Sequence, residues 1–94
     1  MKPDIFLSVR FKLPSEDGRM TPVEGQSYGC PLIVDGEAFD CRLMLAGQKL
    51  ELGKVYEIPV KFLNPDLVLP KLSIGKTITL WEGKEVASGQ VLRL

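Results

Sequence analysis

The chain of 94 residues has no histidine, two cysteines and a single tryptophan. Without histidine, the usual general base at neutral pH, the commonest metal ligand and every Ser–His or Cys–His nucleophile pair are excluded. Two cysteines are too few for a cysteine-rich metal site or a disulfide framework. We therefore expect a protein that is not an enzyme, with no catalytic residue, no metal and no cofactor.

The sequence also lacks a net charge and a long apolar segment. Twelve basic and twelve acidic residues cancel, so no overall field attracts nucleic acid or an anionic membrane. No apolar run approaches the roughly 18 residues of a membrane-spanning helix, and the first residues do not resemble a signal peptide. We expect a single domain over residues 1–94 in the cytoplasm, without membrane contact and with both thiols reduced.

The strongest short signal in the chain is Asp35-Gly36, which separates two β-prone runs, Tyr28–Val34 and Glu37–Leu45. A two-residue turn makes the numbers of opposite residues sum to 71, so that Cys30 faces Cys41. This is a hydrogen-bonded position, where strand geometry suits a disulfide less well. We interpret both cysteines as small buried thiols, with a redox or metal function as the alternative.

Two further runs, Asp4–Leu13 and Lys54–Phe62, carry apolar residues at every second position, which predicts half-buried strands. Pro59 in the second run favours an edge or a bulge over a fully paired central position. On the outward face of the hairpin, Arg42 lies near Asp40, and we expect a weak surface ion pair between them.

Two segments rich in proline and glycine separate the strands. Residues 14–27 predict a long loop without secondary structure, which is either functional or a tolerated surface excursion. The prolines in 63–75 exclude a helical stripe and predict a short extended piece across the barrel end. Within it, Leu67-Val68-Leu69 would be a partner site if exposed and a lid if buried, and we expect burial.

The last segment predicts a closing hairpin of residues 76–81 and 86–94, in which Gly89 indicates a bulge or a close backbone approach. About six strands with frequent turns are thus packed into one short chain. This predicts an all-β fold, a small closed antiparallel β-barrel with Greek-key-like topology, since closure removes exposed strand edges.

Three blocks occur in a recognisable order and cover nearly the whole chain. They are Glu16-Asp17-Gly18-Arg19-Met20-Thr21-Pro22 after the first strand, Leu52-Gly53 leading into Ile58-Pro59-Val60-Lys61-Phe62-Leu63-Asn64-Pro65, and Glu82-Gly83-Lys84 followed by Val86-Ala87-Ser88-Gly89-Gln90-Val91. Together they resemble the C-terminal β-barrel domain (third domain) of elongation factor Tu. That family has an acidic-Gly-Gly-Arg-His-Thr-Pro loop, a Pro-Gly-Asp step before a strand ending in His-Pro, and a last hairpin with Glu-Gly-Gly-Arg and Val-Gly-x-Gly-x-Val.

The resemblance implies that barrel fold and a function through contacts. In the factor, this domain helps hold the T-arm of aminoacyl-tRNA, packs on the GTPase domain and meets the exchange factor. The chain has no Gly-x4-Gly-Lys-Ser/Thr P-loop, so we expect no GTP binding. Met20 replaces the family's histidine, the closing turn is about one residue shorter, and residues 66–76 are longer. Arg19, Thr21 and Pro22 match the family's loop.

We expect the protein to dock a protein partner through the 14–27 loop and the closing turn, with Arg19, Thr21, Trp81 and Lys84 as partner-binding residues. Trp81 would be either an exposed anchor or part of the packing over a barrel end. One alternative is binding of tRNA or other RNA through Arg19 and Lys84, which the neutral charge weakens. Another is a small inhibitor or immunity-type protein that blocks an enzyme.

Overall fold

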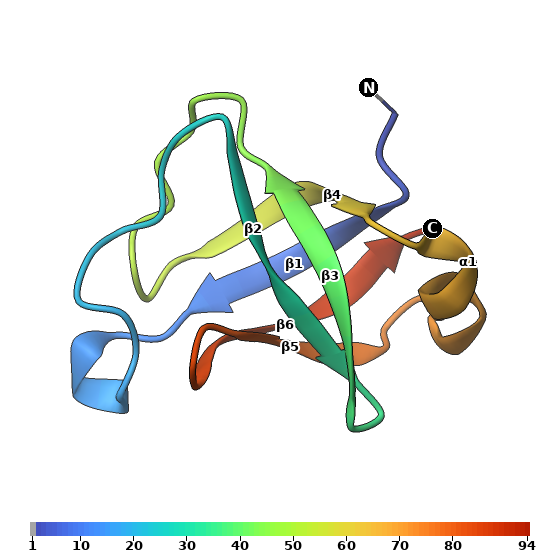
Figure 1. Cartoon of the computed structure of the whole chain (residues 1–94). Helices are drawn as coiled ribbons and strands as arrows, with labels where there is room; N and C mark the ends of the chain where they lie inside the picture. The colour runs from blue at the N-terminus through green and yellow to red at the C-terminus, as the bar shows by residue number, and fades with distance from the viewer. Residues whose placement is uncertain (1) are drawn as a thin grey trace.

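The computed structural model describes residues 2–94, which form a closed barrel of antiparallel strands (Figure 1). Around the barrel the strand order is β1-β4-β3-β2-β5-β6, and β6 pairs with β1. Because β2, β3 and β4 are consecutive neighbours and β1 lies beside β4, the topology is a Greek key. The predicted all-β barrel of six strands is therefore confirmed. The elements are β1 (Ile5–Phe11), η1 (Pro14–Glu16), β2 (Ser27–Val34), β3 (Glu37–Met44), β4 (Val55–Phe62), α1 (Pro65–Val68), η2 (Leu69–Lys71), β5 (Thr77–Trp81) and β6 (Glu85–Arg93).

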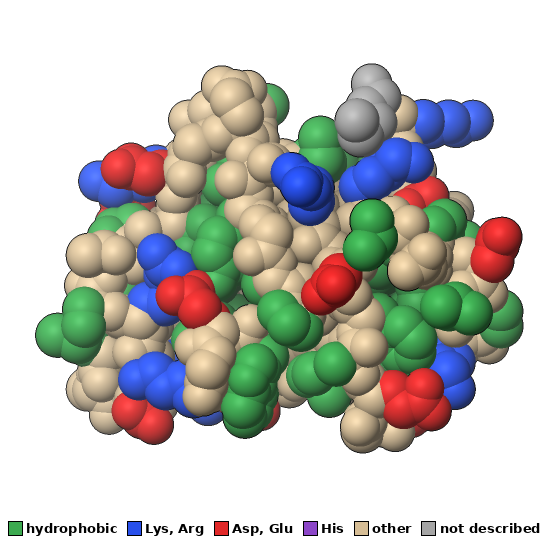
Figure 2. All heavy atoms as spheres, in the orientation of Figure 1, with side chains coloured by type: hydrophobic (Ala, Val, Ile, Leu, Met, Phe, Trp, Pro, Cys, Tyr) green, Lys and Arg blue, Asp and Glu red, His purple; other side chains and the backbone are tan. Residues whose placement is uncertain are grey.

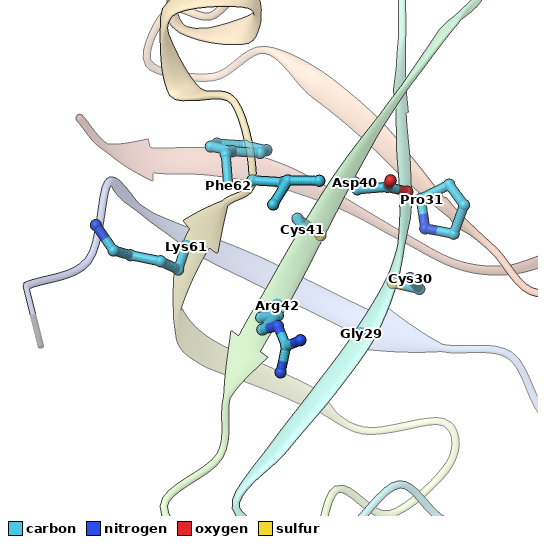
Figure 3. Close-up of a pocket in the computed structure, with 9 residues that line it drawn as sticks. Gly29, Cys30, Pro31, Asp40, Cys41, Arg42, Lys61 and Phe62 are labelled. Atoms are coloured by element: carbon cyan, nitrogen blue, oxygen red, sulfur yellow. The ribbon is translucent and has the colours of Figure 1, made fainter.

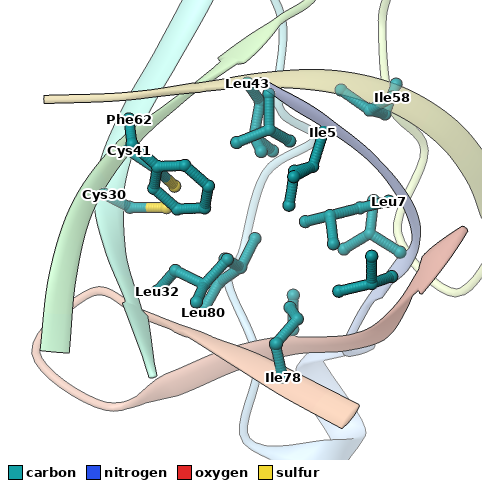
Figure 4. Packing of buried hydrophobic residues seen from close by; sticks show 14 of the residues in the cluster. Ile5, Leu7, Cys30, Leu32, Cys41, Leu43, Ile58, Phe62, Ile78 and Leu80 are labelled. Atoms are coloured by element: carbon teal, nitrogen blue, oxygen red, sulfur yellow. The ribbon is translucent and has the colours of Figure 1, made fainter. Parts of the chain in front are cut away.

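Alternating side chains of the strands fill the barrel interior (Figure 4). Each strand contributes every second residue because successive side chains of a strand point to opposite faces. Within residues 2–94 no polar or charged residue is buried, so the core is wholly apolar. Its fully buried members include Ile5, Leu7, Leu32, Leu43, Leu50, Ile58, Val60, Ile78 and Leu80.

The β2–β3 hairpin has the register that its two-residue turn dictates. Cys30 lies opposite Cys41, and Val34 lies opposite Glu37. Asp35 and Gly36 both have positive φ, of 51° and 77°, as a type I′ turn requires.

Two prolines lie at the ends of the two shortest strand–strand ladders of the barrel. The β2–β5 ladder has only the pairs Leu32–Leu80 and Ile33–Thr79, and the next residue of β2 is Pro31. The β3–β4 ladder stops at Val60, and the next residue of β4 is Pro59, which keeps a partner in β1 alone. Proline has no N–H to donate to a ladder. The prediction that Pro59 is not fully paired is confirmed, but β4 is not an edge strand, because β1 and β3 lie on its two sides.

Gly89 of β6 allows β1 and β6 to close the barrel. It lies opposite Val9 of β1, and a Cβ built on it would fall 2.0 Å from the carbonyl oxygen of Ser8. Only glycine can occupy a position so close to a neighbouring backbone. The predicted close backbone approach is confirmed.

Three expectations for the segments between strands are wrong. β1 ends at Phe11, and Leu13 lies 38% exposed over Gly53 instead of continuing the inward face. Residues 14–27 contain η1 and a bridge from Val23, which is buried, to Leu50 of the connection before β4. The loop is folded onto the barrel because Val23 supplies an apolar anchor that its polar neighbours obscure in the sequence.

Residues 63–75 form α1 and η2 and not the expected extended piece. Pro65 and Pro70 sit in the first positions of these turns, where a missing N–H costs no hydrogen bond. Within the run 67–69, Val68 is fully buried, Leu69 is partly buried against the core and Leu67 is 63% exposed, so the expected burial holds for Val68, in part for Leu69 and not for Leu67. No helix within residues 2–94 is both long and apolar enough to cross a membrane.

Candidate functional site

Three of the four predicted partner-binding residues lie together where the loop after β1 meets the β5–β6 turn. Arg19 forms an ion pair with Glu82 of the turn, and its Nε donates to the carbonyl oxygen of Thr21 at 3.1 Å. Lys84 Nζ lies 3.0 Å from Asp17 Oδ1. These contacts hold the loop against the turn, so both segments form one surface.

Tyr28 completes this contact from β2. Its hydroxyl donates to the Glu82 carboxylate, and the Arg19 guanidinium lies 5.3 Å from the centre of its ring. Burial, with the hydrogen bond to Glu82, raises the pKa of Tyr28, so the hydroxyl remains a donor at neutral pH. Partial burial acts to lower the pKa of Arg19, but the pairing with Glu82 outweighs it and the pKa is raised. The charges of Arg19 and Lys84 are thus compensated within the chain.

Trp81, the fourth predicted residue, lies on the outer surface of the barrel. Its side chain is 45% exposed, so it is not part of the core. It borders a groove of about 430 Å³ over the outer faces of β2, β3 and β5. We call this surface the Trp81 face; the groove is lined by Pro31, Ile33, Ala38, Thr79, Trp81 and Glu85. Four of these six side chains are apolar.

A second groove, of about 550 Å³, lies beside the Trp81 face and shares Pro31 with it (Figure 3). We call it the Arg42 groove. Outward-facing residues of β2, β3 and the end of β4 form its rim, and both cysteines contribute to its floor. Its lining residues are Gly29, Cys30, Pro31, Asp40, Cys41, Arg42, Lys61, Phe62 and Leu63. The expected ion pair of Arg42 with Asp40 is not formed, and Arg42 makes no ion pair with any residue from 2 to 94.

The two cysteines are free thiols beneath this groove. Cys30 is 8% exposed, and Cys41 still less. The neighbouring Cys30 side chain, together with burial, raises the pKa of Cys41. Because the thiolate is the nucleophile and metal ligand, a raised pKa makes Cys41 unreactive.

We predict that the unfolded, unreduced protein contains two titratable thiols. The hydrogen-bonded register of Cys30 and Cys41 disfavours a disulfide, and the core packs around them as free side chains. Ellman titration in denaturant measures this directly, with a sample reduced beforehand as the reference. Zero thiols before reduction would contradict the prediction.

Sequence reasoning did not assign Pro31 or Ile33 to a surface groove, although Pro31 lines both grooves and Ile33 lines the one beside Trp81. Pro31 and Ile33 point outward from β2, while their neighbours Leu32 and Val34 fill the core. A signal for this was present, because Cys30-Pro31-Leu32-Ile33-Val34 is an unbroken apolar run. Such a run on a barrel strand indicates apolar side chains on both faces.

Within residues 2–94, no three His, Cys, Asp or Glu side chains are grouped closely enough to bind a metal ion. Comparison of the sequence with protein-family models and with curated proteins gave no match.

Proposed function

We propose that the protein is a non-catalytic binding module of the cytoplasm that docks a protein partner through the Trp81 face. The observation that carries this proposal is the exposed indole of Trp81 at the border of an apolar groove. A tryptophan loses little side-chain entropy on binding for the area it buries, and aromatic anchors dominate interface energies.

The shape of the Trp81 face supports a protein partner over a nucleic acid. Its lining is mostly apolar and its one charged member, Glu85, is acidic and pairs with Lys12 at 2.8 Å. RNA affinity requires cations that neutralise phosphates, whereas the Trp81 face carries no lysine or arginine, and Arg19 and Lys84 beside it are each paired with a carboxylate. We therefore propose that Arg19, Thr21 and Lys84 hold the loop after β1 against the β5–β6 turn, beside the docking surface.

The three blocks that resemble the third domain of elongation factor Tu support the same function. In that factor the domain acts by contacts with other domains and with partners, and has no chemistry of its own. We propose that this chain uses the same kind of barrel without the GTPase, and that its partner surface differs. The docking face here is centred on Trp81 and Pro31, which lie outside the matching Arg19-Met20-Thr21-Pro22 loop.

The test is a comparison of Trp81→Ser with Met20→Ser. Both changes remove an exposed apolar side chain, since Met20 is 80% exposed, but only Trp81 lines the groove. We expect Trp81→Ser to lower the free energy of unfolding by no more than about 1 kcal/mol, and to abolish capture of the partner by the immobilised protein from cell extract. Met20→Ser should retain capture. Equal capture by both variants, or destabilisation of Trp81→Ser by several kcal/mol, would overturn the assignment.

A further inference from the structure

The Arg42 groove continues the Trp81 face along the outer wall of the barrel, because Pro31 lines both. In the view of Figure 2, apolar side chains spread over the wall that β2 and β3 cross, with charged side chains between them. Leu63, at the rim of the Arg42 groove, is 71% exposed. A partner segment that covers Trp81 would therefore have further apolar surface to follow toward Arg42.

The rim of the groove places two cations at directly opposite positions of neighbouring strands. Arg42 of β3 pairs in register with Lys61 of β4. Like charges at such positions disfavour the strand pair. Lys61 Nζ forms an ion pair with Asp4 Oδ1 at 3.6 Å, but Arg42 makes no ion pair with any described residue. Arg42 therefore stabilises the fold through no ion pair, and its guanidinium is available to a ligand.

The groove beside Arg42 is open because Gly29 has no side chain. A Cβ built on Gly29 would meet no atom closer than the Cys41 carbonyl oxygen at 3.9 Å, so the groove can accommodate an added methyl group at this position without a clash. Figure 3 shows Arg42 directed toward the strand that carries Gly29, and Asp40 directed toward Pro31. The guanidinium and the carboxylate thus face different parts of the groove.

These charges determine which anion fits. A guanidinium binds a carboxylate through two parallel hydrogen bonds. The second cation of the groove, Lys61, is paired with Asp4. The Asp40 carboxylate in the same groove repels additional negative charge, and this repulsion is greater for a phosphate dianion than for a carboxylate. The apolar remainder of the lining, including Phe62 and Leu63, suits the aliphatic or aromatic neighbours of an acidic residue.

We propose that the Arg42 groove binds an acidic side chain of the same protein segment whose apolar side chains cover the Trp81 face. This inference rests on the proposed docking function. It defines the partner segment as one that combines an aromatic or large aliphatic residue with a nearby Asp or Glu. Arg42 is the specificity-determining residue, and Trp81 is the anchor.

The experiment is selection of a random-peptide phage library on the intact protein, followed by affinity measurement with synthetic versions of the enriched peptides. We expect the enriched peptides to combine apolar residues with Asp or Glu. Their affinity should fall about tenfold for Arg42→Glu, and a peptide with Lys in place of the acid should then bind the variant better than the acidic peptide does. Gly29→Val, which fills the groove, should weaken the acidic peptide as well.

Lys54→Glu is the matched control, because it makes the same charge change at an exposed lysine that lines neither groove. It should leave affinity unchanged. If Trp81→Ser abolishes binding while Arg42→Glu and Lys54→Glu act alike, the acidic subsite is wrong and the docking function stands. If no enriched peptide depends on Trp81 or Arg42, both proposals are overturned. Tighter binding of a peptide with phosphoserine at the acidic position would overturn the choice of a carboxylate.

Discussion

Replacing Gly89 with alanine should destabilise the barrel by about 3 kcal/mol or more. The added methyl group would lie 2.0 Å from the Ser8 carbonyl oxygen and 3.1 Å from the Val9 Cα. Neither atom can rotate away, because both belong to the backbone of β1, which is paired with β4 on its other side. Relief requires β6 to move away from β1, which loosens the closure of the barrel.

Urea unfolding followed by far-UV circular dichroism measures this loss. For a domain of this size, 3 kcal/mol corresponds to a fall in Tm of roughly 12–24 °C. The matched control is Gly29→Ala, a glycine in β2 whose Cβ would meet no atom closer than 3.9 Å. That variant should be as stable as the wild type or slightly more so, since alanine restricts the unfolded chain. Equal stability of the two variants would contradict the close approach of β6 to β1.

The sequence is sufficient to predict the elements whose geometry is set locally. The Asp35-Gly36 turn has two residues, so it fixes every pair of the β2–β3 hairpin, including Cys30 with Cys41. Alternation of apolar residues gives the inward face of β1 because the side-chain period of a strand is two. Gly89 indicates a close approach for the same local reason, the absence of a side chain.

Segments that depend on distant contacts are not predictable in this way. Val23 is buried because Leu50, far along the chain, completes its bridge. α1 is a single turn, which is too short to produce a helical stripe, and Pro65 starts it although proline inside a helix would break it. Proline disfavours a helix when it lies in the helix interior, but it is tolerated in the first turn.

The candidate site likewise combines features that local sequence predicts with features that depend on distant contacts. Exposure of Trp81 at the end of β5 was one of two alternatives that the sequence left open, since a turn-edge aromatic can pack inward or outward. The Arg19–Glu82 pair joins residues 63 positions apart, and nothing local marks Glu82 as its partner. Each groove spans at least three strands, so the Trp81 face requires the register of β2 with β3 and β5, and the Arg42 groove requires that of β3 with β2 and β4.

Replacing Leu32 with alanine should lower the free energy of unfolding by about 3–5 kcal/mol. Leu32 is completely buried and belongs to one of the two residue pairs that join β2 to β5, opposite Leu80. Because so few backbone pairs join β2 to β5, the stability of this ladder depends on side-chain packing inside the barrel. A cavity there removes dispersion contacts from both strands, and the surrounding closed sheet cannot collapse into it easily.

Leu63→Ala is the control for Leu32→Ala, because the same atoms are removed from a side chain that is 71% exposed. It should change the free energy of unfolding by about 0.5 kcal/mol at most. Hydrogen exchange adds a local measurement: in Leu32→Ala the amides that hydrogen-bond across the β2–β5 ladder should lose more protection than those that hydrogen-bond across the β1–β4 ladder. A loss shared equally by both ladders would show that the β2–β5 ladder opens only with the whole barrel. A Leu32→Ala variant as stable as Leu63→Ala would mean that Leu32 does not occupy the core.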